Sequence, residues 1–191
     1  MNIGIDLDGV LYDTTNYILT YAELFDMQIG GKGIINPNET KIFKRYGWSK
    51  ENYNEFIQCL KRFDKEAPMM PFAKEVIEIL QKDGHKLIAI TARGSVVPEE
   101  VEITKKRLSD DKINFDKIYY NTPNKLEICK NENIDILIDD FYDTAEALSK
   151  EGITILYFRD LVLKFCDNPN VFEVHNWGEI YRTINSLKNK I

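Results

Sequence analysis

The feature that most restricts the fold of this chain is an alternation of strand-like and helix-like segments that begins near residue 72. Apolar runs of strand length occupy 86–91, 134–138 and 153–158, and amphipathic stretches with helical periodicity lie between them. Parallel strands require such crossover helices, because the chain must return to the starting edge of the sheet before the next strand begins. The pattern therefore predicts an α/β fold in which helices flank both faces of a mostly parallel sheet.

The expected elements follow from this periodicity. Strands are expected at 3–7, 86–91, 118–120, 134–138, 153–158 and 171–174, and helices at 72–82, 98–108, 125–130, 144–150 and 177–187. Residues 14–71 differ, because aromatic residues recur there at helical spacing around a glycine-rich break at 30–33. We expect a core domain made of residues 1–13 and 72–191, and a small helical cap, residues 14–71, inserted after the first strand.

The charge of the chain limits the classes of partner. It has 191 residues, 43% of them hydrophobic, with a net charge of −6 and a pI near 5.1. An acidic chain is poorly suited to the phosphate backbone of nucleic acid or to an anionic membrane. We therefore expect no nucleic acid polymer and no membrane as partner. A small phosphorylated metabolite is compatible with this charge, since a metal ion can neutralise it locally.

Cysteine and histidine spacing gives no sign of a zinc site. Cys59, Cys129 and Cys166 are too scattered for a zinc motif or a disulfide framework. His85 and His175 show no ligand spacing and are expected at the surface. No apolar run is long enough to span a membrane, and the N-terminus lacks the pattern of a signal peptide. We expect a cytoplasmic protein with reduced thiols.

The first strand leads directly into two aspartates. Asp6 and Asp8 are separated by one residue, so a strand would point both side chains to the same face, and Gly9 follows them. Like charges held this close repel each other, and their burial is costly. Alone, two such acids could equally cap a turn or a helix, but a hard divalent cation would offset both costs.

Further polar residues end the other strands. Thr91 ends the second expected strand, and Asp139 and Asp140 end the fourth. Ligands of open α/β sheets bind beyond the carboxyl ends of the strands. We therefore expect these residues to meet the aspartates of the first strand at one edge of the sheet.

Taken in order, these residues resemble the four motifs of the haloacid dehalogenase superfamily. The matching positions are Asp6-x-Asp8-Gly9-Val10, Thr91, Lys125 and Asp139-Asp140. The resemblance covers residues 1–13 and 72–160, and it implies a Rossmann-like parallel sheet with a cap inserted after the first strand. Within the superfamily the chain is most similar to the 5′-nucleotidases of the deoxyribonucleotidase group. This similarity lies in Ile-Asp-Leu-Asp-Gly-Val-Leu at 5–11, Ile-Thr-Ala-Arg at 90–93 and Ile-Asp-Asp at 138–140.

The resemblance implies a covalent mechanism supported by Mg²⁺. Asp6 would attack phosphorus to form an aspartyl-phosphate, and Asp8 would protonate the leaving oxygen and later activate water. Proton donation near neutral pH requires a raised pKa at Asp8, which neighbouring carboxylates favour. The expected metal ligands are Asp6, the backbone carbonyl of Asp8, and Asp140, with Asp139 bound directly or through water.

The resemblance also implies how phosphate is held. A phosphate oxygen would accept hydrogen bonds from Thr91 and from the amide of Ala92, while Lys125 pairs with the phosphate. Lys117 and Lys130 are alternatives for the lysine, and Lys125 is favoured by its distance from the strand that follows it.

The expected function is Mg²⁺-dependent hydrolysis of a small phosphomonoester, with nucleoside 5′-monophosphates, deoxy or not, as the favoured substrate class. A phosphatase for a sugar phosphate or another small metabolite is the first alternative. A non-catalytic binding or regulatory module on the same fold is the second. Dehalogenation is disfavoured, because the second aspartate of the first motif and the metal-binding pair are typical of the phosphatase branch. A homodimer stays open, since nothing in the sequence fixes the oligomeric state.

Several residues near the motifs have no assigned role. Asp13 and Asp143 are more consistent with structural roles, although longer versions of the fourth motif carry an acid close to the position of Asp143. Arg93 could contact substrate or pair with a core acid. Most aromatic residues of the cap are expected in its core, and Tyr12 and Trp48 are the candidates to stack on a nucleobase.

Overall fold

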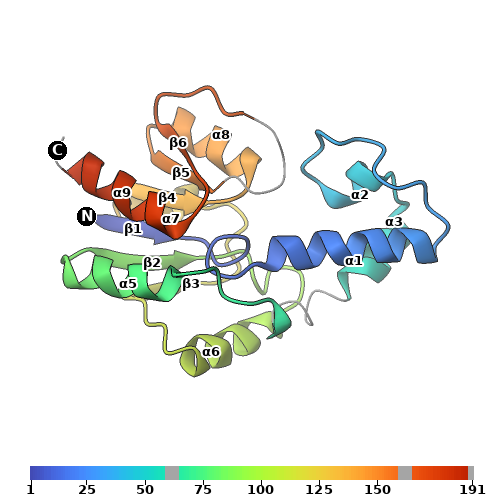
Figure 1. Ribbon diagram of the computed structural model, residues 1–191, viewed down its shortest axis with the longest axis horizontal. Helices are drawn as coiled ribbons and strands as arrows, with labels where there is room; N and C mark the ends of the chain where they lie inside the picture. Colours follow the sequence, from blue (N-terminus) through green and yellow to red (C-terminus); the bar gives the residue numbers. More distant parts are fainter. Residues whose placement is uncertain (59–64, 159–164, 189–191) are drawn as a thin grey trace.

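A six-stranded sheet forms the centre of the molecule, which the computed structural model describes for residues 1–58, 65–158 and 165–188 (Figure 1). The strands are β1 (Asn2–Ile5), β2 (Lys86–Ile90), β3 (Lys117–Tyr119), β4 (Ile136–Asp139), β5 (Thr154–Phe158) and β6 (Val171–Val174). They lie in the order β3-β2-β1-β4-β5-β6, and every neighbouring pair is parallel. The predicted α/β class and parallel sheet are confirmed.

Helices cover both faces of this sheet. One face carries α5 (Ala73–Lys82), α6 (Glu100–Asp110) and α9 (Trp177–Lys188), and the other carries α7 (Leu126–Asn131) and α8 (Tyr142–Lys150). Two separate groups of buried apolar side chains fill the space between the sheet and the helices, one on each side. Such a sheet needs strands that are apolar on both faces, as the continuous apolar runs of the sequence predict.

Strand β1 is buried on both of its faces. Ile3 and Ile5 point to the side of α5 and α9 and have no solvent exposure. Gly4 faces the other side, where an added Cβ would lie 2.8 Å from Cδ1 of Leu137 on β4. Burial of one aliphatic side chain of this size contributes about 1.5–3 kcal/mol. Strand β1 is therefore a firm support for the residues that follow it.

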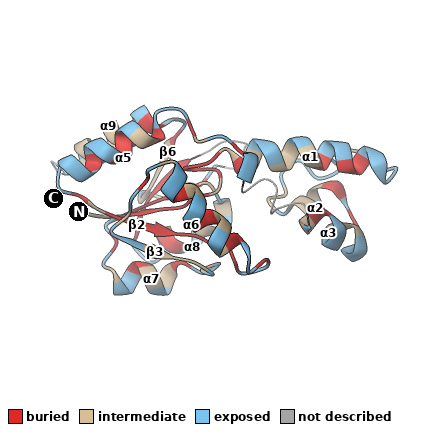
Figure 2. Cartoon of the chain, turned by 90° about the horizontal axis from the view of Figure 1, so that it is seen from below, coloured by how far each residue is buried: buried red, intermediate tan, exposed pale blue. Residues whose placement is uncertain are grey.

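Residues 14–58, called the helical segment below, extend away from one edge of the core (Figure 1). They form α1 (Thr14–Gln28), α2 (Ile42–Tyr46) and α3 (Lys50–Ile57). Phe25, Trp48 and Phe56 make a small core of their own, with ring centroids 5.0, 5.6 and 4.9 Å apart. Asp26 is buried beside them and accepts a hydrogen bond from Trp48 Nε1 at 2.7 Å. Figure 2 shows buried and exposed residues alternating along α1, as expected for an amphipathic helix.

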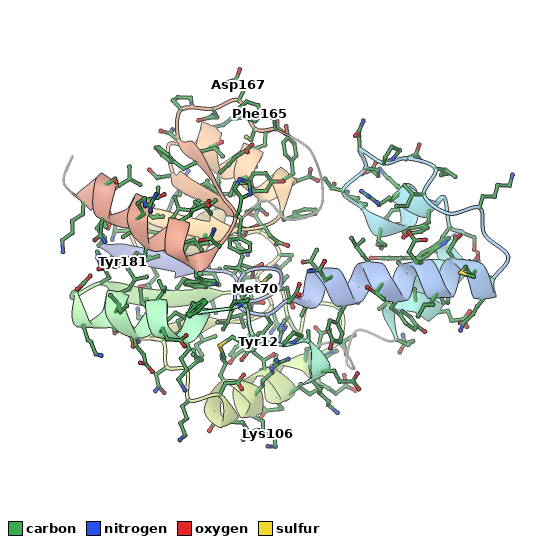
Figure 3. The ribbon with its side chains drawn as sticks, in the orientation of Figure 1. Tyr12, Met70, Lys106, Phe165, Asp167 and Tyr181 are labelled. Atoms are coloured by element: carbon green, nitrogen blue, oxygen red, sulfur yellow. The ribbon has the colours of Figure 1, made fainter. Side chains whose placement is uncertain are left out.

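Two stretches of chain, residues 11–13 and 68–70, connect the helical segment to the core and are hydrogen-bonded to each other. The backbone N–H of Asp13 donates to Pro68 O at 2.8 Å, and that of Met70 donates to Leu11 O at 2.8 Å. Tyr12, in the first of these connections, is fully buried, and Figure 3 shows it near Met70 where α1 begins. Any motion of the helical segment relative to the core has to bend both connections at this place.

One surface prediction is wrong, because His85 is buried. Its side chain is 5% exposed, and neither ring nitrogen has a hydrogen-bond partner among the described residues. Burial lowers the pKa of His85, and the positive charges of the N-terminus and Lys188 lower it further. His175 is exposed, as predicted.

Two of the three cysteines lie in the part of the chain that the structure describes. Cys129 and Cys166 are free and buried, and Cys59 lies outside the described residues. Burial raises the pKa of Cys129 to about 11, so this thiol is protonated at neutral pH. Within the described ranges, no helix combines the length and the hydropathy needed to cross a bilayer.

Candidate active site

The carboxyl ends of β1, β2 and β4 bring predicted residues from distant parts of the chain to one edge. Asp6 follows β1, Thr91 follows β2, and Asp139 ends β4. The backbone N–H of Asp6 donates to Ile138 O at 3.0 Å, which extends the pairing of β1 with β4 by one residue. The parallel register thus places side chains more than a hundred positions apart in direct proximity.

Three carboxylates form a compact cluster at this edge. One oxygen from each of Asp6, Asp139 and Asp140 lies within 4.8 Å of the others. Asp6 and Asp139 are buried, and Asp140 is half-buried. The hydroxyl of Thr15, in the first turn of α1, donates to Oδ2 of Asp140 at 3.0 Å. This hydrogen bond links the cluster to the helical segment.

A buried lysine joins two of these carboxylates. Nζ of Lys125 lies 2.9 Å from Oδ1 of Asp6 and 2.6 Å from Oδ2 of Asp139. The structure therefore places Lys125 in the cluster, whereas Lys117 and Lys130 pair with glutamates elsewhere. Lys125 directly precedes α7, so the start of that helix sets the position of the ammonium group.

The cluster shifts the proton affinity of its members. Burial raises the pKa of Asp6 to about 7, against the opposing charge of Lys125. Burial and the neighbouring carboxylates raise the pKa of Asp140 well above its usual range. Burial favours neutral Lys125, but Asp139 and Asp6 outweigh this effect and raise its pKa. One lysine does not neutralise three carboxylates, so a divalent cation would displace protons as it bound.

The residues present fit a hard divalent cation. All donors are carboxylate oxygens, and Mg²⁺ holds such oxygens at about 2.0–2.1 Å. Gly9 has a φ of +68°, and a Cβ at this position would lie 1.9 Å from Oδ2 of Asp140. The glycine thus keeps space beside the cluster open. The oxygens of Asp139 already accept hydrogen bonds from Lys125 at 2.6 Å and from the backbone of Phe141 at 2.8 Å, so Asp139 is the most restrained of the acids.

Asp8 is held by an arginine. Nε of Arg93 donates to Oδ2 of Asp8 at 2.9 Å, and Nη2 donates to Oδ1 at 2.7 Å. Arg93 is buried, and its Nη1 donates to the hydroxyl of Thr104 on α6 at 3.1 Å. Burial disfavours ionised Asp8, but the charge and hydrogen bonds of Arg93 outweigh this and lower its pKa. The expected rise in the pKa of Asp8 is therefore wrong, because the charge and hydrogen bonds of Arg93 outweigh the effect of burial.

Thr91 and Ala92 form the turn after β2. The hydroxyl oxygen of Thr91 accepts a hydrogen bond from the backbone N–H of Arg93 at 3.2 Å, and the residue is fully buried. Its own backbone N–H donates to Tyr119 O on β3 at 2.9 Å. The hydroxyl hydrogen can still donate, since a threonine oxygen both gives and accepts. Ala92 is exposed, and the contact of its amide with phosphate stays a prediction.

Both aromatic candidates for base stacking pack against protein. Tyr12 is fully buried, and the guanidinium carbon of Arg107 lies 3.8 Å from its ring centroid. Trp48 stacks on Tyr46, with centroids 4.9 Å apart. Because Tyr12 has no exposed surface, the prediction that it stacks on a nucleobase is wrong. For Trp48, which lines a cavity, it stays a prediction.

Some residues of the site carried no signal in the sequence. Thr15 and Thr104 position an acid and an arginine, yet nothing in the sequence pattern separates them from other threonines. Asp13 and Asp143 lie outside the carboxylate cluster, the first half-buried and the second exposed. The sequence did indicate Arg93 as a candidate site residue, because it follows Thr91 by two residues at a strand end.

A cavity of about 240 Å³ opens beside the cluster. Asp8 and Asp140 line it on the core side, and Thr40, Ile42 and Arg45 line it on the side of the helical segment. The same space therefore touches the acidic edge of the sheet and the inserted helices.

Comparisons with known proteins agree with the motifs, although no family model matches the chain. Over 196 residues it is 28% identical to "Putative nucleotidase YqfW" of Bacillus subtilis, covering 100% of this chain and 97% of that protein. It is likewise 28% identical to a nucleotidase of Clostridium acetobutylicum, covering 100% and 96% of the two chains. A haloacid dehalogenase-like family hydrolase of Streptococcus pneumoniae superposes with a TM-score of 0.63 at 18% identity, over 96% of this chain and 97% of that one. The chain therefore has the fold of the haloacid dehalogenase superfamily and is homologous, over its whole length, to proteins named nucleotidases.

Proposed function

We propose that this chain is a Mg²⁺-dependent phosphomonoester hydrolase that acts through an aspartyl-phosphate, with nucleoside 5′-monophosphates as its substrate class. The observation that carries the proposal is the cluster of Asp6, Asp139 and Asp140, bridged by Lys125 at the carboxyl edge of the sheet. The names of the full-length homologues favour a nucleotide over other phosphate esters.

In the first step, a carboxylate oxygen of Asp6 attacks phosphorus. The new bond to phosphorus forms as the bond from phosphorus to the leaving oxygen breaks. Lys125 lies 2.9 Å from Oδ1 of Asp6, so its ammonium orients the carboxylate and offsets the charge of the phosphoryl group. A bound Mg²⁺ supplies further neutralisation of the transferring phosphoryl oxygens.

Asp8 is assigned the proton transfers. It gives a proton to the leaving oxygen, and then takes one from the water that attacks the aspartyl-phosphate and releases inorganic phosphate. The pair with Arg93 keeps Asp8 ionised in the absence of substrate, which suits the second transfer. Donation in the first step therefore requires the pair to weaken when substrate binds.

The helical segment is proposed to be part of a cap over this site, and the whole cap is proposed to span residues 14–71. The hydrogen bond from Thr15 to Asp140 and the cavity shared with the core support this role. A cap of this kind would exclude bulk water while the aspartyl-phosphate exists.

The proposal is tested by assaying 4-nitrophenyl phosphate, a nucleotide panel and a sugar phosphate panel, with Mg²⁺ and with EDTA. We expect hydrolysis only with Mg²⁺, and higher kcat/KM for nucleotides than for sugar phosphates. Asp143→Asn, which changes an exposed acid outside the cluster, serves as the control variant and should match the wild type. Activity on aryl and sugar phosphates alone would overturn the substrate class. No Mg²⁺-dependent hydrolysis of any ester would overturn the reaction and favour a non-catalytic module.

A further inference from the structure

We infer that Arg45 selects the leaving group of the substrate, by donating hydrogen bonds to an acceptor oxygen on the side away from phosphorus. This inference rests on the proposed hydrolysis of phosphate esters and adds a specificity-determining residue to it. It is carried by the hydrogen bonding of Arg45, by the cavity that this residue lines, and by the other groups of that cavity.

The guanidinium of Arg45 is incompletely satisfied. It lies in α2, where its Nη1 donates to Pro37 O at 2.8 Å. Its Nε is buried and has no hydrogen-bond partner among the described residues, and no carboxylate of those residues forms an ion pair with it. Buried donors are almost always paired, because an unpaired one loses its hydration without compensation. Nε is not exposed to the cavity that Arg45 lines, so it gains a partner when the side chain turns toward a ligand bound there.

The cavity connects Arg45 to the catalytic carboxylates. Arg45 lines the same space of about 240 Å³ as Asp8 and Asp140. A phosphoryl group bound next to Asp6 would therefore extend its leaving group toward α2. The oxygen that Asp8 protonates and the oxygen that Arg45 recognises would lie at opposite ends of that group.

The chemistry of the cavity limits which group of a substrate can accept a hydrogen bond from Arg45. Arginine donates and never accepts, so its partner must be an acceptor oxygen or nitrogen. Glu39 lines the same cavity, and its negative charge disfavours a second phosphate on the leaving group. Ile18, Ile42 and Tyr157 supply apolar walls. The volume lies below the range of about 300–1000 Å³ that is common for ligand pockets. A compact neutral ring with a carbonyl oxygen, as in a nucleobase, fits this setting better than a second anion.

A purely structural role for Arg45 makes a different prediction. If its only task were to hold the loop at Pro37, its loss would weaken the hydrolysis of all substrates to a similar extent. A selecting role instead changes the ratio between substrates with and without the acceptor. The ratio of kcat/KM values is therefore the informative readout.

The test compares Arg45→Met and Arg45→Lys with the wild type on three substrates. Uridine 5′-monophosphate carries ring carbonyls, ribose 5-phosphate lacks the base, and fructose 1,6-bisphosphate carries a second phosphate. Lys44→Met, an exposed neighbour on the same helix, is the matched control. We expect the ratio of kcat/KM for uridine 5′-monophosphate over ribose 5-phosphate to fall about 10-fold or more in Arg45→Met. It should fall less in Arg45→Lys and stay at the wild-type value in Lys44→Met.

The three substrates distinguish a nucleobase carbonyl from a second phosphate as the group that accepts the hydrogen bond of Arg45. A fall confined to uridine 5′-monophosphate supports a nucleobase carbonyl, and a fall confined to fructose 1,6-bisphosphate assigns the acceptor to a second phosphate. Unchanged ratios for both substrates in folded variants would overturn the role of Arg45 while leaving the proposed hydrolysis intact. Wild-type protein that hydrolyses none of the three esters with Mg²⁺ would overturn both. If Arg45→Met does not fold, Arg45→Lys, which keeps the charge, carries the comparison.

Discussion

Arg93 illustrates how one buried cation sets the state of a reactive group. Its guanidinium binds both oxygens of Asp8, at 2.9 and 2.7 Å, and is itself held by Thr104 at 3.1 Å. A bidentate pair of this kind fixes the orientation of the carboxylate as well as its charge. Arg93 is thus a positioning residue for the acid that is proposed to transfer protons.

Arg93→Met should lower kcat for nucleotides by about 100-fold, because a mispositioned acid–base group forfeits much of its contribution. Arg93→Lys should recover part of this loss, since the charge remains but the paired hydrogen bonds do not. Steady-state kinetics on folded variants, verified by thermal melts, measure the effect. Arg182→Met, an exposed arginine on α9, is the control. Wild-type kcat in a folded Arg93→Met variant would contradict the positioning role.

At the scale of elements, β1 and the turn after it determine the geometry of the site. The strand is buried between β2 and β4, so Asp6 leaves it at a fixed place. The turn needs a glycine, because Gly9 has a φ of +68° and lies against the carboxylate of Asp140. The same residue therefore sets the backbone conformation of the turn and the space beside the carboxylate cluster.

Gly9→Ala should reduce Mg²⁺-dependent activity by about 100-fold, as expected when one electrostatic contact of a buried site is lost. The reason is that the new Cβ would lie 1.9 Å from Oδ2 of Asp140 and displace it. Gly84→Ala is a matched control, since Gly84 has a φ of +80° and no atom within 4 Å of the added Cβ. Both variants share the backbone strain, but only the first should lose activity and Mg²⁺ binding, as measured by kinetics and calorimetry. Equal activity of the two variants would rule out the steric explanation.

His85, which directly precedes β2, makes a pH-dependent contribution to stability. Burial lowers the pKa of His85 below its unfolded value of about 6.5, so the folded state favours the neutral ring. The corresponding stability is present above pH 6.5 or so and is lost as the pH falls toward the folded pKa. The melting temperature should therefore drop more steeply between pH 7.5 and 5.5, roughly, in the wild type than in His85→Leu. His175→Leu, at an exposed position, should follow the wild type. Parallel pH profiles for His85→Leu and the wild type would contradict this role of His85.

The sequence was informative wherever local periodicity or a strand-end rule decides the structure. Strands such as 86–90 and 154–158 were predicted to within one residue, and Asp6, Thr91 and Asp139 were expected at one edge because parallel strands share that edge. Lys125 was expected there only through the resemblance to a known family. An ion pair with an acid was one of the two roles expected for Arg93, but its partner Asp8 could not be named, since the pair joins residues 85 positions apart. The burial of His85 and Trp48 and the position of Arg45 depend on tertiary contacts that local spacing does not encode.

At the scale of the whole molecule, the acidic cluster places a charged site where the core meets the helical segment. Asp140 contacts Thr15 of α1, residues 11–13 directly precede that helix, and residues 68–70 are hydrogen-bonded to them. A cation that neutralises this cluster would stabilise the core and the attachment of the helical segment together. Metal binding and overall stability should therefore be coupled.

Mg²⁺ should raise the melting temperature of the wild type, with a gain of about 2.7 kcal/mol at a concentration of 100 times Kd. Asp140→Asn should lose this response, because a ligand is removed, while its metal-free melting temperature should not fall below that of the wild type. Asp143→Asn should respond like the wild type. Differential scanning fluorimetry over a Mg²⁺ titration gives the result. A wild type that shows no Mg²⁺ response would contradict the metal site.

Detection of a phosphoryl group on Asp6 tests the proposed reaction most directly. Wild-type protein is mixed with uridine 5′-monophosphate and Mg²⁺, quenched in acid during turnover, and digested for mass spectrometry. We predict a phosphorylated peptide that maps to Asp6, which is absent with EDTA and in Asp6→Asn, and a fall in hydrolysis of at least about 1000-fold in that variant. Turnover without any phosphoryl group on Asp6, or hydrolysis retained in Asp6→Asn, would contradict the aspartyl-phosphate mechanism.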